Sequence, residues 1–115
     1  MTELASRRCV PCRGDTPPLR AKEVQAMMQQ VPGWTTDAEG KLTRNIALGN
    51  FKEALALVNK IGDLAEQEGH HPDLTLHSWN QVRIELYTHS IKGLSESDFI
   101  LAAKINQLLP AGSEV

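Results

Sequence analysis

The sequence EQEGHHPDLTLHSWNQVRIELYTHSIKGLSESD, residues 66–98, decides how we expect the chain to fold. After Pro72, apolar and polar residues alternate over residues 74–77 and again over residues 82–89, and a candidate turn at 78–81 separates the two runs. A period of two is typical of a strand with one buried face. The stretch therefore predicts an antiparallel hairpin that begins just after a His-His pair.

A long amphipathic helix is expected before this hairpin. Asn50 can accept hydrogen bonds from the first free amide groups of a helix, and Glu53 stands three residues on, which is a typical capping pattern. The helix should run to about Glu68, because Gly69 then stands where a left-handed residue closes the last turn. Apolar residues at helical spacing predict one buried stripe, formed by Phe51, Ala54, Leu55, Val58, Ile61, Gly62 and Ala65.

Three further elements complete the pattern. Apolar residues at positions i, i+3, i+4 and i+7 predict a first helix over residues 19–31. A second hairpin is expected between Trp34 and Leu48. Ser95, with Asp98 three residues on, should cap a last helix that ends near residue 109. The order α-β-β-α-β-β-α predicts an α+β fold, in which a four-stranded antiparallel sheet carries three helices on one face.

The first eighteen residues differ in character from the rest. Residues 1–18 show no hydrophobic period, and Pro17-Pro18 stops any helix, so we expect an extended N-terminal arm. Residues 19–115 should form a single domain around one core. Cys9 and Cys12 lie on the arm, and the sequence has no second cysteine pair that could complete a four-thiolate zinc site. Two surface thiols are the simpler interpretation.

Charge and hydropathy argue against two classes of partner. Twelve basic and fourteen acidic residues give a net charge of −2, and no basic run extends beyond Arg7-Arg8. We therefore expect no nucleic acid partner. No apolar stretch approaches the length of a spanning helix, and no secretory peptide is recognisable, so we expect no membrane partner and a cytoplasmic location.

The histidines of the opening stretch are the candidates for proton chemistry. His70, His71 and His89 lie within twenty residues, with Glu66 and Asp98 on the two flanks. Imidazole exchanges protons near neutral pH, and it is the side chain most often used in general acid-base catalysis. Taken singly, each histidine is more simply a polar surface residue. Their joint presence beside two carboxylates favours a functional role.

A metal site is the competing interpretation of these histidines. A His-His pair beside a helix end could bind a metal together with a third histidine. The helical spacing of zinc enzymes is absent, and no carboxylate or cysteine follows at a recognisable ligand spacing, so we expect no metal. Trp34 and Trp79 are by default core residues, but a tryptophan directly after Pro32-Gly33 could also stack on a planar ligand.

These residues together resemble the signature of the pterin-4a-carbinolamine dehydratases, also called 4a-hydroxytetrahydrobiopterin dehydratases. The matching positions are Glu66, His70-His71-Pro72, Trp79, His89 and Asp98. The resemblance includes Pro32-Gly33-Trp34 and Gly93-Leu94-Ser95-Glu96, and it covers residues 19–109. The arm with Cys-Val-Pro-Cys is similar to the N-terminus of bacterial members.

The resemblance implies a reaction and the residues that perform it. A 4a-hydroxytetrahydropterin would lose water to give the quinonoid dihydropterin, in tetrahydrobiopterin-type cofactor recycling after aromatic amino acid hydroxylation. The catalytic group around the C4a and N5 edge of the pterin would be His70, His71 and His89, with His71 as the preferred acid. The residues that bind or orient the substrate or the histidines would be Glu66, Pro72, Asp98 and Trp34. No cofactor is implied, because the pterin is itself the substrate.

A non-catalytic protein-binding or transcriptional cofactor module is the alternative function. The resemblance includes animal members that act as dimerisation cofactors of a homeodomain transcription factor through a helical surface. Leu57 and Leu64, on a second stripe of the long helix, could form such a surface. The uncovered face and edges of the sheet favour self-association, so we expect a homodimer or homotetramer.

Overall fold

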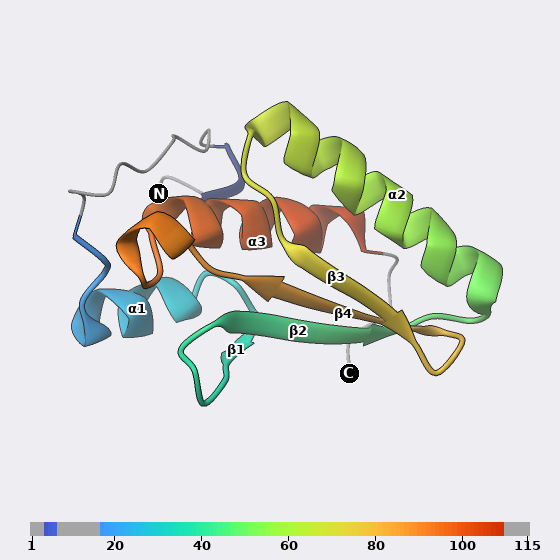
Figure 1. The fold of residues 1–115 in the computed structure, drawn as a ribbon, viewed down its shortest axis with the longest axis horizontal. Helices are drawn as coiled ribbons and strands as arrows, with labels where there is room; N and C mark the ends of the chain where they lie inside the picture. The colour runs from blue at the N-terminus through green and yellow to red at the C-terminus, as the bar shows by residue number, and fades with distance from the viewer. Residues whose placement is uncertain (1–3, 7–16, 110–115) are drawn as a thin grey trace.

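Four antiparallel strands form one sheet in the spatial order β1-β2-β4-β3 (Figure 1). The strands are β1 (Thr35–Thr36), β2 (Leu42–Ala47), β3 (Asp73–His77) and β4 (Gln81–Leu86). The structure is a computed structural model, and it describes residues 4–6 and 17–109 of the chain. The predicted four-stranded antiparallel sheet is confirmed.

The two central strands, β2 and β4, pair over their full length. Leu42 lies opposite Leu86 at one end of the pairing, and Ala47 lies opposite Gln81 at the other. Alternate residues of both strands are buried, and these are Leu42, Arg44, Ile46, Val82, Ile84 and Leu86. β4 is shorter than predicted, because it ends at Leu86 and the chain enters a 3-10 helix, η2 (His89–Ile91).

Three α-helices complete the predicted order of elements. They are α1 (Ala21–Met28), α2 (Phe51–Glu68) and α3 (Glu96–Leu108). Figure 1 shows α2 and α3 on the same face of the sheet. Because α3 is apolar nearly all round, it is the most deeply buried helix, as its residues Phe99 to Ala103 show. Within the described residues, no helix combines the length and the apolar character needed to cross a membrane.

The inward stripe of α2 agrees with the predicted one at Ala54, Ile61 and Ala65 and differs from it at other positions. The buried residues are Ala54, Leu57, Ile61 and Ala65. Phe51 and Leu55, which we placed on the buried stripe, are 49% and 43% exposed, and Leu57, expected to lie on an exposed stripe, is 4% exposed. Both stripes satisfy helical spacing, so the sequence pattern does not choose between them. Packing against the sheet and α3 makes the choice.

The capping residues of the two long helices are as predicted. The Asn50 side chain accepts a hydrogen bond from the Glu53 amide at 2.8 Å, which begins α2. Gly69 follows the last turn of α2 in a left-handed conformation, with φ of 66°. Ser95 and Asp98 form a capping box at the start of α3. Both ends of α2 and the start of α3 therefore have capping partners for free backbone groups.

The N-terminal arm is described in two short pieces. Leu4–Ser6 forms a 3-10 helix, η1, which contacts α3, and Leu4 is only 3% exposed. This piece is helical and anchored in the core, whereas we expected an extended segment. Leu19 then joins the domain through its amide, which donates to the Leu94 carbonyl at 2.8 Å. Cys9 and Cys12 lie outside the described residues.

The two tryptophans occupy opposite environments. Trp34 is 4% exposed and belongs to the core, as the default interpretation predicts. Trp79 is 61% exposed in the turn between β3 and β4, so the same interpretation is wrong for it.

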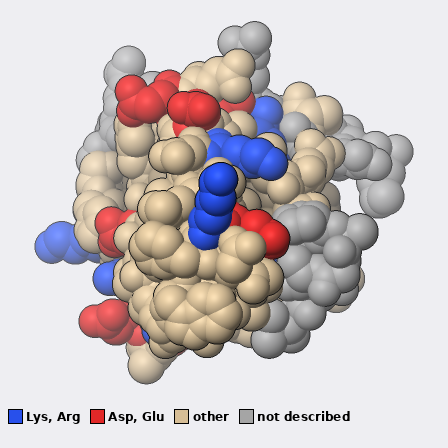
Figure 2. All heavy atoms as spheres, turned by 90° about the vertical axis from the view of Figure 1, so that its right-hand side faces the viewer, with Lys and Arg blue, Asp and Glu red and all other residues tan. Residues whose placement is uncertain are grey.

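Figure 2, which faces the right-hand side of Figure 1, shows basic and acidic side chains interspersed on this side of the molecule.

Candidate active site

His70 reaches the site directly after the end of α2. The left-handed Gly69 turns the chain away from the helix axis, and the His70 side chain extends to the first turn of α3. There its Nε2 atom lies 2.6 Å from Oδ1 of Asp98. The His70 side chain is 15% exposed, and the Asp98 side chain is fully buried. The two residues thus form a buried pair, although 28 positions separate them in the sequence.

Asp98 accepts hydrogen bonds on both of its carboxylate oxygens. Its Oδ2 atom accepts from Thr88 Oγ1 at 2.8 Å and from the Ser95 amide at 2.9 Å. A carboxylate that only accepts hydrogen bonds fits this network when His70 Nε2 is the donor to Oδ1. In that tautomer, His70 Nδ1 is the ring nitrogen with a lone pair.

His71 forms a second histidine-carboxylate pair in a more open position. Its Nε2 atom lies 2.5 Å from Oε2 of Glu66, which stands in the last turns of α2. The side chains are 61% and 79% exposed. Pro72 follows His71 and disfavours helical geometry there, so the chain leaves α2 in an extended form. His71 is consequently paired, but it is accessible to a ligand from solvent.

His89 is the first residue of η2 and is exposed. Its ring packs edge-on against Tyr87, with ring centroids 5.1 Å apart and an interplanar angle of 70°. The preceding residue, Thr88, pairs with Gly93 in an isolated antiparallel bridge and donates its hydroxyl to Asp98. The carboxylate of Asp98 therefore connects the segment that carries His89 to the imidazole of His70.

Two residues at this junction were not among the predicted site residues. Thr88 is 7% exposed and Ser95 is 6% exposed, and their hydroxyl oxygens lie 2.9 Å apart beside Asp98. The sequence marked Ser95 only as a helix cap. The position of Thr88 directly before His89 was the available signal for its role, but a threonine near a strand end is too common to be singled out.

Trp34 lies in a different set of contacts. Its indole N–H donates to Asn106 Oδ1 at 2.8 Å, and Arg44 Nη1 donates to the same oxygen at 2.9 Å. Asn106 stands eight residues beyond Asp98 on α3, which corresponds to about 12 Å along a helix axis. No hydrogen bond described here joins Trp34 to His70, His71 or His89. The structure therefore brings together the three histidines' segments, Glu66 and Asp98, and leaves Trp34 in the core.

His77, the fourth histidine of the chain, contacts two polar side chains. His77 Nε2 lies 2.8 Å from Asn45 Oδ1, and His77 Nδ1 lies 3.1 Å from Ser78 Oγ. These contacts lie away from Asp98 and are in keeping with a structural role.

Within residues 4–6 and 17–109, no three histidine, cysteine, aspartate or glutamate side chains are grouped so that they could hold a metal ion.

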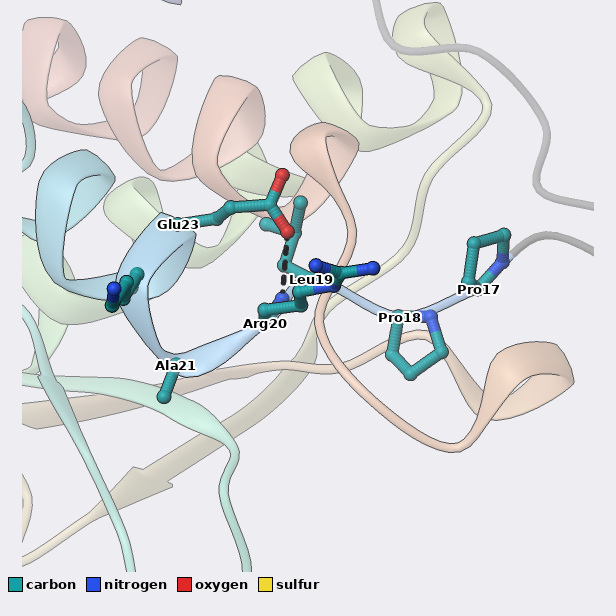
Figure 3. Close-up of a pocket in the computed structure, with 7 residues that line it drawn as sticks. Pro17, Pro18, Leu19, Arg20, Ala21 and Glu23 are labelled. Carbon is teal, nitrogen blue, oxygen red and sulfur yellow. Dashed lines mark hydrogen bonds between the residues drawn. The ribbon is translucent and has the colours of Figure 1, made fainter.

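A hollow of about 820 Å³ lies beside the segment that leads into α1. Its lining residues run from Pro17 to Glu23, and Figure 3 shows the Glu23 carboxylate turned back to the Arg20 amide, which donates to it at 2.8 Å. None of the three candidate histidines lines it. Pro18 nevertheless packs against Gly93 in the loop after His89, since a Cβ on Gly93 would lie 2.5 Å from Pro18 Cβ.

One protein family matches most of the chain. The model of the family described as "Pterin 4 alpha carbinolamine dehydratase" matches residues 17–108. The chain belongs to this family. The family resemblance predicted from the sequence is confirmed, and because a dehydratase is a hydro-lyase, the chain is a member of an enzyme family.

Individual relatives of the family agree in sequence and in fold. A Rubrobacter xylanophilus protein named "Putative pterin-4-alpha-carbinolamine dehydratase" is 46% identical over 108 residues, which cover 94% of this chain and all of the relative. "Pterin-4-alpha-carbinolamine dehydratase 2, mitochondrial" of Arabidopsis thaliana is 43% identical over 112 residues, covering 94% of this chain and 60% of the relative. A crystal structure of the "transcriptional coactivator/pterin dehydratase" from Brucella melitensis has a TM-score of 0.73 and 28% identity, and it covers 79% of this chain and 97% of its own.

Proposed function

We propose that this family member dehydrates a 4a-hydroxytetrahydropterin to the quinonoid dihydropterin. In this reaction the C4a–O bond breaks, and the oxygen takes a proton and leaves as water. N5 loses its proton, and the electron pair that remains forms the double bond between N5 and C4a. The names of the relatives support this substrate. The reaction needs one group that donates a proton and one that accepts a proton, and histidines can do both near pH 7.

The buried His70-Asp98 pair is the observation that carries this proposal. When His70 Nε2 donates to Asp98, the other ring nitrogen, Nδ1, is left as a base. A carboxylate behind a histidine also stabilises the imidazolium that forms when the histidine accepts a proton. His70 is therefore the preferred acceptor for the proton from N5. His89 is the other candidate for this role.

His71 is the preferred acid for the departing hydroxyl. It is accessible from solvent, and its Nε2 atom is held by the Glu66 carboxylate. His71 follows His70 directly in the chain, so one substrate of the size of a pterin ring could meet both. Proton transfer by such positioned groups is typically worth about a hundredfold to ten-thousandfold in rate. The proposed acceleration is of that size.

Stopped-flow measurement of synthetic 4a-hydroxytetrahydropterin decay tests the proposed reaction. Decay should be faster with the protein than without it, and the rate should rise in proportion to enzyme concentration. We propose that neither a metal nor an added cofactor takes part, so the rate should be unchanged after dialysis against a chelator. Decay at the spontaneous rate in the presence of folded protein would overturn the proposed function.

A second candidate is a protein-binding role, alone or beside the reaction. The Brucella melitensis neighbour carries "transcriptional coactivator" in its name. On this chain, α2 presents Phe51 and Leu55 to solvent, in place of the Leu57 and Leu64 that we first considered. The same exposed residues, and the free edges of β1 and β3, support the proposal of a homodimer or homotetramer. Light scattering on the purified protein measures the assembly.

A further inference from the structure

Thr88 contacts the capping box of α3 through its side chain, although Ser95 and Asp98 alone form that box. Its side-chain hydroxyl donates to Asp98 Oδ2 at 2.8 Å and lies 2.9 Å from Ser95 Oγ, and the residue is 7% exposed. We propose that Thr88 is a positioning residue, which orients the Asp98 carboxylate toward His70 and holds the His89 segment beside it. This inference rests on the proposed acid-base function of the histidines.

The two carboxylate oxygens of Asp98 meet different partners. In a capping box the carboxylate accepts from the backbone amide of the capping residue, and here the Ser95 amide fills that role at 2.9 Å. The Thr88 hydroxyl is a second donor to the same Oδ2 atom. With both donors on Oδ2, the carboxylate plane is fixed and Oδ1 is left for His70 Nε2. Ser95 Oγ also approaches Oδ2, at 3.4 Å, so the Thr88 hydroxyl makes the shortest of the three contacts to this oxygen.

The backbone of Thr88 pairs with that of Gly93. Its amide donates to the Gly93 carbonyl at 3.0 Å, and the Gly93 amide donates back at 3.4 Å. These two bonds close the loop that contains η2, and His89 is the first residue of that loop. The Thr88 side chain therefore ties this loop to Asp98, and through Asp98 to His70. A single buried hydroxyl thus connects the segments of two proposed catalytic histidines.

The test compares two substitutions at position 88 with a matched control. Thr88→Val keeps the branched shape and removes the hydroxyl, and Thr88→Ser keeps the hydroxyl and removes the methyl group. Thr75→Val makes the same chemical change on β3, where Thr75 is exposed. Loss of a hydrogen-bond partner behind a metal-ligating side chain typically costs about 10–100-fold, and we take the lower end of this range for a histidine without a metal. We expect Thr88→Val to lower kcat by about tenfold with KM within about twofold, and Thr88→Ser and Thr75→Val to remain near the unmodified rate.

A spectroscopic readout separates this inference from the proposed function. The ring-nitrogen NMR shifts of His70 report which nitrogen carries the proton, and they can be measured with or without turnover. Thr88→Val should shift these signals toward a mixture of tautomers, and Thr88→Ser should restore them. Unchanged His70 signals in a folded Thr88→Val protein would overturn the inference, even if dehydration were confirmed. Changed signals in a protein without dehydratase activity would support the positioning role and refute the proposed function.

A measurement on the unmodified chain covers the case in which Thr88→Val does not fold. A buried hydroxyl that donates to a carboxylate exchanges its proton slowly with water, so the Thr88 hydroxyl proton should be visible by NMR. Thr75, which is exposed, should show no such signal. Absence of the Thr88 signal would overturn the inference.

Discussion

The Nε2 atom of His70 lies 2.6 Å from Oδ1 of Asp98, and the aspartate side chain has no exposed surface. His70 follows the end of α2 and Asp98 stands in the first turn of α3, so the pair also joins two helix ends. A hydrogen bond to a charged group is stronger than one between neutral groups, and burial increases the cost of breaking it. Stability and the proposed chemistry therefore depend on the same contact.

Asp98→Asn should reduce both the stability and the activity of the protein. The asparagine side chain has one oxygen, which accepts, and one NH2 group, which donates. In either orientation, the NH2 group takes the place of a carboxylate oxygen that contacts His70 Nε2 or the Thr88 hydroxyl. We expect the free energy of unfolding, measured with urea, to fall by about 1–3 kcal/mol. The dehydration rate of the folded fraction should fall by at least about tenfold. The loss of a supporting contact typically lowers activity about 10–100-fold.

Asp73→Asn is the control for this change, because Asp73 is an exposed residue of β3 whose side chain makes no hydrogen bond to the described residues. It should leave both quantities unchanged. Full stability together with full activity in Asp98→Asn would contradict the role of the buried pair.

His71→Ala and His89→Ala should lower activity without unfolding the chain. Both side chains are exposed, and substitutions at such positions usually change the free energy of unfolding by no more than about 0.5 kcal/mol. Loss of an acid or base should cost about a hundredfold or more in kcat. Stopped-flow assays and urea titrations measure the two effects. His77→Ala serves as control and should retain full activity; full activity in both other variants would end the acid-base assignment.

Gly33→Ala should destabilise the protein more than Gly40→Ala. Both glycines have positive φ, 89° and 82°, so each alanine adds roughly 1–2 kcal/mol of left-handed strain. A Cβ at Gly33 would also lie 2.4 Å from Arg44 Nη1, whereas nothing lies within 4 Å of the one at Gly40. Arg44 would have to give up its hydrogen bonds to Pro32 and Asn106, for about 2 kcal/mol more. Equal losses in thermal unfolding of the two variants would contradict this account.

Trp34→Phe should cost stability, and Trp79→Phe should not. Trp34 is 4% exposed and donates its indole N–H to Asn106, so its replacement loses buried volume and a hydrogen bond, together about 1–3 kcal/mol. Trp79 is 61% exposed, and its replacement should remain within about 0.5 kcal/mol. Tryptophan fluorescence during urea unfolding compares the variants. A large loss of stability in Trp79→Phe would show that the turn is more tightly packed than its exposure indicates.

Much of the fold was predictable because it depends on local rules. The alternation in residues 82–86 predicts a half-buried strand, and β4 has that pattern of burial. Asn50 and Gly69 predicted the two ends of α2 from the hydrogen-bond needs of helix termini, and the structure has both caps. The errors concern position in space. Phe51 and Leu55 were placed on the buried side of α2 because helical spacing identifies stripes, but not the stripe that meets the sheet.

The sequence by itself determined the order of the elements, the ends of α2 and α3 and the family, since these depend on neighbouring residues and on a motif of fixed spacing. Only the tertiary structure decided that His70 meets Asp98, that Thr88 lies behind them, and that Trp79 is exposed. These contacts join residues from different elements. They depend on how helices and strands pack around a shared core, and no local pattern encodes that packing.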